Sequence, residues 1–322
     1  MKKKRTSIFE RKTAAMLLAA STSVVWAFAF PLIKLGIPAF GIAADDTGAK
    51  TLFAGVRFFT AGVIVLAASL LNEKRSVQLP EGGGALGEKP LSGLLLALLL
   101  GLVNTALHYF CYYIGLSNLS GSRSAVIDSL SSFILILAAC AVFRDESLTV
   151  SKALGCVLGF CGILLVNAGG GASAPLSFTG DGMLVLSAVF SAAGGLLTRV
   201  VTRRIPAGIA TGISLGFGGL LLMLSGVLMG GRLGTPTLSG AFILCCLIGI
   251  STYGFSVYNK LISCNPVGEI AIFNSLIPIL GVTFSCLLLG EPLRLNYAAA
   301  GLLVAAGIFI INYSGSREAC HE

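Results

Sequence analysis

Apolar residues occur along the chain in long blocks, which short polar or glycine-rich segments separate. Many blocks are close to the roughly 20 residues that an α-helix needs to cross the hydrocarbon core of a bilayer. The blocks are rich in Leu, Ala and Gly and show no alternation with a period of two, which argues against a membrane β-barrel. The pattern predicts ten transmembrane helices, at residues 13–37, 52–71, 91–116, 125–143, 150–166, 183–201, 207–229, 238–258, 270–289 and 295–312.

Composition supports a membrane protein. Charged residues make up 11% of the 322 positions, whereas about 25% of an ordinary soluble domain is charged. The net charge of +8 does not indicate nucleic-acid binding, because six of the 22 basic residues lie within the first twelve positions, before the first apolar block. That block continues past the length of a signal-peptide core, so we expect an uncleaved first helix.

The distribution of basic residues predicts the orientation in the membrane. With the N-terminus inside, the inner segments hold 15 of the 22 Lys and Arg residues, the outer segments hold four, and three lie within predicted helices. Cytoplasmic segments of membrane proteins carry such an excess. We therefore expect both termini to be cytoplasmic and the number of spans to be even.

The second half of the chain repeats landmarks of the first. Asp128-Ser129-Leu130 recurs as Asn274-Ser275-Leu276, and a glutamate follows each motif, Glu146 in the first half and Glu291 in the second. Five helices per repeat require the second repeat to cross the membrane in the opposite sense. Inverted repeats recur in secondary transporters, where two similar halves exchange inward- and outward-open states around a central site. We expect a basic tail at 1–12, repeats at 13–168 and 181–313, a linker at 169–180 and a cytoplasmic tail at 314–322.

Three segments resemble a known family. They are Trp-Ala-Phe-Ala-Phe-Pro-Leu-Ile-Lys from Trp26 to Lys34, the pair Arg57-Phe58, and Pro278 followed by a hydrophobic run into Gly-Glu-Pro-Leu at 290–293. In this order they resemble the EamA-type branch of the drug/metabolite transporter superfamily, over about residues 14–312. The resemblance implies an all-α, ten-helix inverted-repeat fold in the cytoplasmic (inner) membrane and export of amino acids or related metabolites. The first repeat has Ser132 in place of Pro278, so a kink in the fourth helix is not predicted from the sequence.

Four ionisable residues are expected in the outer halves of the first four helices: Lys34, Arg57, His108 and Asp128. Ionisable side chains inside a span are costly and usually face a partner or a polar site. Lys34 or Arg57 could bind a substrate carboxylate, while Asp128 or His108 could balance charge or exchange a proton. The alternative is a structural Asp128–Arg57 ion pair, with Lys34 extending to the outer headgroups.

Aromatic and polar side chains near the predicted mid-depth could complete a binding site. Rings could stack on the apolar part of a small zwitterion, while amide and hydroxyl groups satisfy its ends. Trp26 could equally be a buried structural residue. Tyr109, Tyr112 and Tyr113 together span more than one helix face, so we expect at most two of them to line one cavity. The predicted substrate site consists of Trp26, Arg57, His108, Tyr112, Asp128, Tyr253, Asn274 and Ser275.

Glu146 and Glu291 lie at predicted turns before the fifth and tenth helices, where a carboxylate stabilises a helix N-terminus. We interpret both as structural residues and not as proton carriers. Glycines spaced by four residues, as at Gly208, Gly212 and Gly216, most simply allow close helix packing.

No G-x-x-x-x-G-K-[ST] or H-E-x-x-H motif occurs, and the cysteines lack the spacing of a metal site. We expect no catalytic residue, metal or cofactor, and no enzyme activity. The leading hypothesis is a secondary exporter of amino-acid-like metabolites, with a proton as the candidate coupling ion. The alternatives are an uptake permease, an intramembrane lipid-modifying enzyme that uses His108 with Asp128, and a membrane scaffold. Expected partners are a small-molecule substrate and the lipid bilayer, without nucleic acid; a homodimer is one possible assembly.

Overall fold

The structure is a computed structural model that describes residues 8–75, 90–142, 148–168, 176–265, 270 and 272–318. Every regular element in these ranges is helical, without a strand. Glu146 and residues 169–175 of the predicted linker lie outside the described residues.

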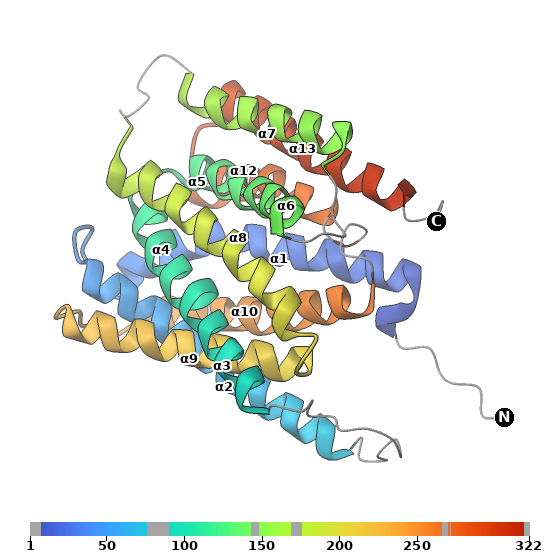
Figure 1. Cartoon of the computed structure of the whole chain (residues 1–322). Coiled ribbons are helices and arrows are strands. Elements are labelled where there is room, and N and C mark those ends of the chain that lie inside the picture. The colour runs from blue at the N-terminus through green and yellow to red at the C-terminus, as the bar shows by residue number, and fades with distance from the viewer. Residues whose placement is uncertain are drawn as a thin grey trace.

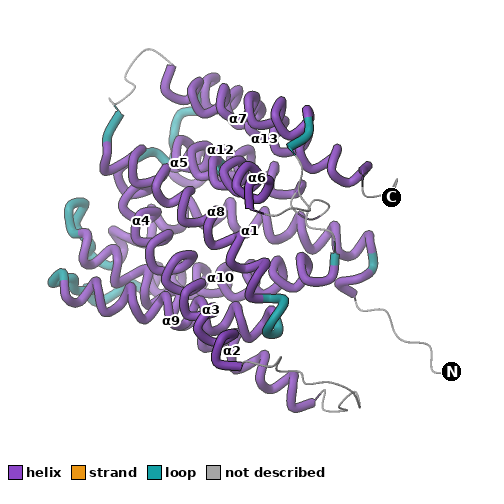
Figure 2. The backbone as a smooth tube through the Cα atoms, viewed as in Figure 1, coloured by secondary structure: helices purple, strands orange, loops and turns teal. Residues whose placement is uncertain are grey.

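The helices form one bundle, with α1 and α10 near its centre and the α7–α13 pair along one edge (Figure 1; Figure 2). Besides α-helices, the chain forms two 3-10 turns, η1 (Ile8–Glu10) and η4 (Ile272–Ser275), and two π-helical turns, η2 (Gly101–Leu107) and η3 (Phe178–Gly182). The α-helices are α1 (Lys12–Ala39), α2 (Thr47–Arg75), α3 (Pro90–Leu100), α4 (His108–Asn118), α5 (Gly121–Asp128), α6 (Leu130–Val142), α7 (Val150–Ala168), α8 (Met183–Val201), α9 (Ala207–Leu228), α10 (Leu238–Cys264), α12 (Leu276–Leu289) and α13 (Leu295–Glu318).

Seven helical segments are long and apolar enough to cross a membrane, and three shorter apolar helices accompany them in the described part of the chain. The all-helical membrane fold is therefore confirmed. The start of α1 and the end of α13 lie on the same side of the bundle, as an even number of crossings requires (Figure 1). Ten spans with cytoplasmic termini stay a prediction.

The fourth predicted helix is broken although it contains no proline. α5 ends at Asp128, and α6 begins at Leu130. At the break, the Ser129 hydroxyl donates to the carbonyl of Ala125 (2.9 Å), and the Ser131 hydroxyl donates to that of Asp128 (2.8 Å). Hydroxyl groups that bond back to the preceding turn bend helices, which supplies the bend without proline.

The corresponding helix of the second half is interrupted at the equivalent position. The 3-10 turn η4 ends at Ser275, and α12 begins at Leu276, two residues before Pro278. The two irregular points fall on the related motifs that begin at Asp128 and Asn274. Each break removes a polar side chain from a regular helix face and places it inside the bundle.

Helices pack in matched pairs. α2 packs on α9, and α7 packs on α13; α1 packs on α10 and α12, while α8 packs on α4 and α6. If the two predicted repeats are exchanged, the α2–α9 and α7–α13 pairs map onto themselves, and the two pairs made by α1 become the two pairs made by α8. The pattern is therefore the one expected of two inverted repeats.

The α2–α9 pair is close enough to require glycine. A Cβ added at Gly62 would collide with the backbone nitrogen of Gly216, and one added at Gly219 would collide with the backbone nitrogen of Phe59. Only glycine allows the two backbones to approach in this way. The predicted packing role is thus supported at Gly212, where a Cβ would lie 2.7 Å from the Leu66 backbone, whereas a Cβ at Gly216 would make only ordinary contacts with Gly62, at 4.0 Å.

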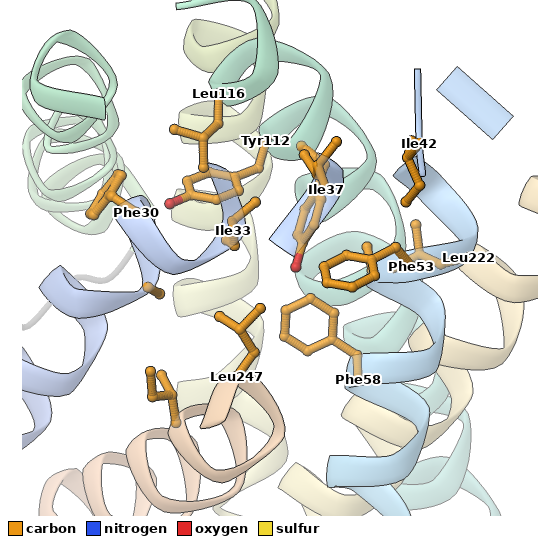
Figure 3. Packing of buried hydrophobic residues seen from close by; sticks show 14 of the residues in the cluster. Phe30, Ile33, Ile37, Ile42, Phe53, Phe58, Tyr112, Leu116, Leu222 and Leu247 are labelled. Atoms are coloured by element: carbon orange, nitrogen blue, oxygen red, sulfur yellow. The ribbon is translucent and has the colours of Figure 1, made fainter. Parts of the chain in front are cut away.

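The main apolar core lies between α1, α2, α4 and α10. It buries Phe30 and Ile33 of α1, Phe53 of α2, Leu116 of α4 and Leu247 of α10, whose side chains converge in Figure 3. Polar side chains that enter this region are surrounded by apolar groups, so the bonds they make define the candidate site.

Candidate substrate site

Arg57 is a buried cation held by neutral groups. It lies on α2 with 2% of its surface exposed. Its Nε donates to Ser251 Oγ (2.8 Å) and to the Leu247 carbonyl (3.2 Å) of α10, and its Nη1 donates to Tyr113 Oη (3.1 Å). The guanidinium carbon also lies 4.7 Å from the ring centroid of Phe58. Within the described residues no carboxylate pairs with Arg57, and a buried charge is costly without a counter-charge. Arg57 can therefore accept an anionic group.

Asp128 is an unpaired carboxyl group at the break between α5 and α6. Its side chain makes no hydrogen bond or ion pair with another described residue. Both Asp128 and Arg57 act electrostatically on the hydroxyl groups of Tyr109 and Tyr112. The two charges thus lie near the same pair of tyrosines without touching. The alternative prediction of a structural Asp128–Arg57 ion pair is wrong.

His108 connects α4 to α8. Its Nδ1 lies 3.0 Å from the Ser187 carbonyl oxygen and 2.9 Å from Ser187 Oγ. Because a carbonyl only accepts, the proton of the neutral ring is assigned to Nδ1. The imidazole packs on Tyr109, with the ring centroids 4.2 Å apart, and on Tyr112, at 5.8 Å. His108 therefore supports the tyrosines and leaves Nε2 as the acceptor.

Lys34 lies on α1 and binds the end of α4. Its Nζ donates to the carbonyl of Leu119 and to that of Leu116 (3.5 Å). A cation stabilises the free carbonyls at a helix C-terminus. These bonds give Lys34 a structural role at the end of α4, and its predicted extension to the headgroups stays a prediction.

A row of five aromatic rings connects the surroundings of Arg57 to the far end of α10. Phe58 contacts Tyr109 (ring centroids 3.9 Å apart), and Tyr109 contacts Phe255 (6.4 Å). Phe255 contacts Trp26 (5.6 Å), which contacts Tyr258 (5.0 Å). We call these five residues the aromatic row. Their faces can pack on an apolar or aromatic ligand.

Two buried polar atoms beside the aromatic row lack partners. Trp26 Nε1 and Asn274 Oδ1 make no hydrogen bond with a described residue. The amide nitrogen of Asn274 donates to Tyr258 Oη (3.0 Å), which fixes the side chain. Most buried polar atoms in proteins are hydrogen-bonded, so both atoms are candidates for ligand contact.

The predicted site residues do not all meet. Trp26, Asn274 and Arg57 contact the aromatic row, and His108 and Tyr112 pack beside it. Ser275 is buried next to Asn274, at the start of α12. Tyr253 lies elsewhere: it is 38% exposed, and its Oη is 2.6 Å from Ser21 Oγ.

Sequence reasoning missed Phe255 and Ser251 as site residues. With Tyr258 they occupy positions i, i+4 and i+7 of α10, which lie on one helix face. That spacing, together with the intramembrane Arg57, was the signal that could have identified them.

Charged groups also meet where α4 joins α5, at the α4–α5 corner (residues 118–123). Glu291 Oε1 accepts from the backbone nitrogen of Gly121 (2.6 Å), while Oε2 accepts from the backbone nitrogen (3.0 Å) and hydroxyl (2.7 Å) of Ser122. Glu291 is thus structural, as predicted, but the helix that it caps is α5 and not the helix that follows it.

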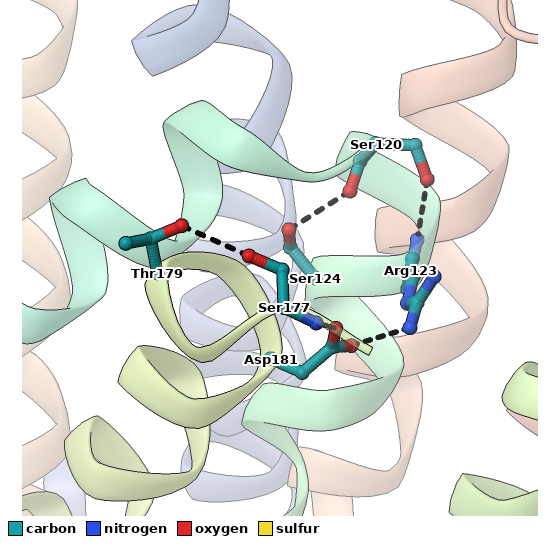
Figure 4. Close-up of polar contacts among 6 residues, drawn as sticks. All are labelled: Ser120, Arg123, Ser124, Ser177, Thr179 and Asp181. Atoms are coloured by element: carbon teal, nitrogen blue, oxygen red, sulfur yellow. Dashed lines mark hydrogen bonds and ion pairs between the residues drawn. The ribbon is translucent and has the colours of Figure 1, made fainter. Parts of the chain in front are cut away.

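Arg123 at the same corner forms an ion pair with Asp181 of η3. The Arg123 Nη2 atom lies 2.6 Å from Asp181 Oδ1, and both side chains are largely buried. Asp181 Oδ2 accepts from the backbone nitrogen of Ser177 (3.0 Å), and Ser120 Oγ accepts from the backbone nitrogen of Arg123 (3.2 Å). Figure 4 shows how these groups converge. The pair neutralises both charges, so it serves the fold.

Ser214 lies in a sequence with the glycine spacing of a hydrolase nucleophile, but it is a packing residue inside a helix. Gly212-Ile213-Ser214-Leu215-Gly216 has the G-x-S-x-G spacing of a nucleophile elbow. It lies inside the continuous helix α9, and not at a strand-to-helix turn. Ser214 Oγ is 3.4 Å from the hydroxyl of Thr105. The segment has no feature of an exposed nucleophile.

Comparison with known proteins gives consistent matches over the chain. A model of the EamA-like transporter family matches residues 13–168 and 178–313. The "Uncharacterized transporter YvbV" of Bacillus subtilis (strain 168) is 26% identical over 316 residues, covering 95% of this chain and 94% of the relative. The "Uncharacterized inner membrane transporter YedA" of Escherichia coli (strain K12) is 25% identical over 297 residues, covering 89% and 87%. A crystal structure with 16% sequence identity superposes with a TM-score of 0.64 over 95% of this chain and 99% of that chain, which shows a shared fold.

Proposed function

The chain belongs to the EamA-like transporter family, and on that premise we propose that it is a secondary transporter that exports amino-acid-like or related small metabolites. Family membership confirms the resemblance predicted from the sequence and makes the protein a transporter and not an enzyme. Its proposed location is the cytoplasmic (inner) membrane, in keeping with the printed name of the E. coli relative.

The unpaired charge of Arg57 carries the proposal. Its guanidinium is buried, bound by neutral acceptors and next to the aromatic row. A substrate carboxylate supplies the missing counter-charge and can bind in a bidentate way. The rings accommodate the apolar part of the same molecule. Small organic acids, including amino acids, fit this arrangement.

Asp128 extends the proposal to the amino group and to the coupling ion. It lies near the tyrosines that Arg57 also influences, so its carboxylate can balance the ammonium group of a zwitterion. A protonated Asp128 can release its proton as the ammonium group arrives. Substrate and proton then exchange for one another, which gives proton-coupled export.

The helix arrangement supports a carrier cycle. The helix pairs exchange with one another when the two halves are interchanged, and Asp128 and Asn274 lie at breaks in corresponding helices. Transporters with inverted repeats place their substrate site at such interrupted helices near the midplane. We propose ten spans, two inverted repeats and cytoplasmic termini on this basis.

Counterflow in liposomes tests the substrate class. Liposomes that contain the purified protein are preloaded in turn with unlabelled amino acids and small organic acids. They should accumulate the matching labelled solute. Arg57→Met should abolish accumulation of every carboxylate because it removes the counter-charge. Arg204→Met is the matched control, since Arg204 contacts Ser92 in an exposed position away from the row. If the Arg57→Met protein is as active as the control, Arg57 does not bind the substrate.

Asp128→Asn tests the coupling ion. The variant should insert normally and still bind substrate, but its transport rate should no longer change with pH or with an imposed proton gradient. Measurement of uptake into liposomes across a series of pH values checks this. A transport rate that depends on pH as strongly as that of the unmodified protein would exclude Asp128 as the proton site.

A further inference from the structure

We propose that Trp26 and Asn274 form a second, neutral anchor that binds an uncharged hydroxyl or amide group of the substrate, opposite the carboxylate at Arg57. The inference rests on the proposed function and narrows its substrate class. The site lies where α1, α10 and η4 meet. The two atoms that form it are Trp26 Nε1 and Asn274 Oδ1, which lack partners within the described residues.

The chemistry of these atoms specifies a neutral group. The indole nitrogen only donates, and the amide oxygen only accepts. A hydroxyl or primary amide both accepts and donates, so it matches the chemistry of both atoms. A carboxylate would be repelled by the amide oxygen, and an ammonium group by the indole N–H.

Tyr258 contacts both side chains of the proposed anchor. Its ring packs on Trp26, with the centroids 5.0 Å apart, and its hydroxyl accepts from the Asn274 amide nitrogen at 3.0 Å. That bond uses one of the two N–H groups of the amide, while the Asn274 oxygen has no partner among the described residues. The orientation of both side chains is therefore fixed before a ligand arrives.

Gly254 lets the indole of Trp26 pack closely against α10. A Cβ added at this position would collide with Trp26 Nε1, so the indole edge occupies the space that a side chain would fill. This contact fixes the position of the indole nitrogen relative to α10. Gly254 lies between Ser251 and Tyr258 on the helix, between the two anchors.

The spacing of the anchors sets the length of the ligand. Arg57 is bound to Ser251 of α10, and Asn274 is bound to Tyr258, seven residues further along. With a rise of 1.5 Å per residue, this corresponds to about 10 Å along the helix. Tyr109 and Phe255 of the aromatic row lie between the anchors. The substrate class is a carboxylate that carries a neutral polar group about two helical turns away, across an apolar or aromatic middle.

A series of straight-chain ω-hydroxy carboxylates tests the anchor. Each is compared with the unsubstituted carboxylate of the same chain length as a competitor of counterflow in liposomes. We expect the hydroxyl to improve competition by about tenfold, but only for chains long enough to reach from Arg57 to Trp26. Trp26→Phe and Asn274→Leu should each remove that advantage, so that within either variant the hydroxy acid competes no better than its parent acid of the same chain length.

Two variants separate the anchor from general effects on the protein. Ser285→Ala removes another buried oxygen without a partner, which lies against Gly121 far from the row, and should keep the hydroxyl advantage. Trp26→Phe keeps an aromatic ring, so its melting temperature should equal or exceed that of the unmodified protein.

The outcomes distinguish the two proposals. If parent acids compete through Arg57 but the hydroxyl never helps, or still helps in Trp26→Phe and Asn274→Leu, the neutral anchor is wrong and the carboxylate site stands. If no acid competes and Arg57→Met changes nothing, both proposals are wrong.

Discussion

Two arginines are buried almost equally but have opposite surroundings. Arg57 is 2% exposed and Arg123 is 4% exposed. Arg123 lies 2.6 Å from the carboxylate of Asp181, whereas Arg57 is bound by two side-chain hydroxyls and a carbonyl. Burial alone therefore does not separate a structural charge from a binding site. The presence of a counter-charge does, because an ion pair is complete whereas a cation bound only by neutral groups can still accept an anion.

The same contrast holds for the regions around them. At the α4–α5 corner, Lys34 binds helix carbonyls and Glu291 binds helix amides, so each charge has a partner. Beside the aromatic row, Asp128 has none among the described residues. We expect substitutions at the corner to change stability and substitutions near the row to change binding.

Asp181→Ala should have the largest effect on stability. It leaves Arg123 buried without its carboxylate, and loss of one partner of a buried pair costs about 3–5 kcal/mol. Chemical unfolding in detergent measures the change. The double variant Asp181→Ala/Arg123→Met should recover much of it, since no uncompensated charge remains. A loss as small as that of an exposed pair would show that the ion pair is not structural.

Glu291→Ala should have the next largest effect. The backbone amides of Gly121 and Ser122 lose their acceptor, and removal of an N-terminal cap costs about 1–2 kcal/mol. Thermal unfolding checks the result. Asp45→Ala, which removes an exposed carboxylate from the α1–α2 loop, is the control and should be nearly neutral. Equal melting temperatures for the two variants would contradict a capping role.

Lys34→Met should destabilise the protein less, by about 0.3–1 kcal/mol, because only a favourable charge at the end of α4 is lost. Competition by carboxylates in counterflow should be unchanged. A loss of competition without a change in stability would instead assign Lys34 to the substrate site.

Arg57→Met should change stability least. The neutral partners of Arg57 lose a donor, but a buried charge is also removed, and such exchanges for apolar side chains are often neutral or stabilising. Binding of carboxylates, measured as a shift of the melting temperature, should disappear. A large loss of stability would place Arg57 in the same structural class as Arg123.

Much of the fold followed from the sequence because hydrophobic blocks and helix lengths are local properties. The site was predicted in part for the same reason: a charged Arg57 or Asp128 inside an apolar block is visible without a structure. Tyr253 was assigned to the site from depth alone. Two residues of helix turn a side chain by about 200°, so Tyr253 faces away from the side occupied by Ser251 and Phe255.

The Arg123–Asp181 pair could not be predicted in this way. The two residues lie 58 positions apart, and both lie outside the helices that the hydrophobic pattern predicts. Their pairing depends on how α4, α5 and η3 pack, which one sequence does not specify. Likewise, Glu291 was expected to cap its own neighbouring helix, because local reasoning favours the nearest partner.

The Glu291 cap has a consequence for the order in which the protein is made. The carboxylate that satisfies Gly121 comes from a residue 170 positions later, near the end of translation. Until it is synthesised, the first amides of α5 lack this acceptor, and free amides are costly in lipid. The first half of the protein therefore inserts as an incomplete unit that the last loop finishes, and a chain cut after the first repeat should be a preferred target of membrane proteolysis.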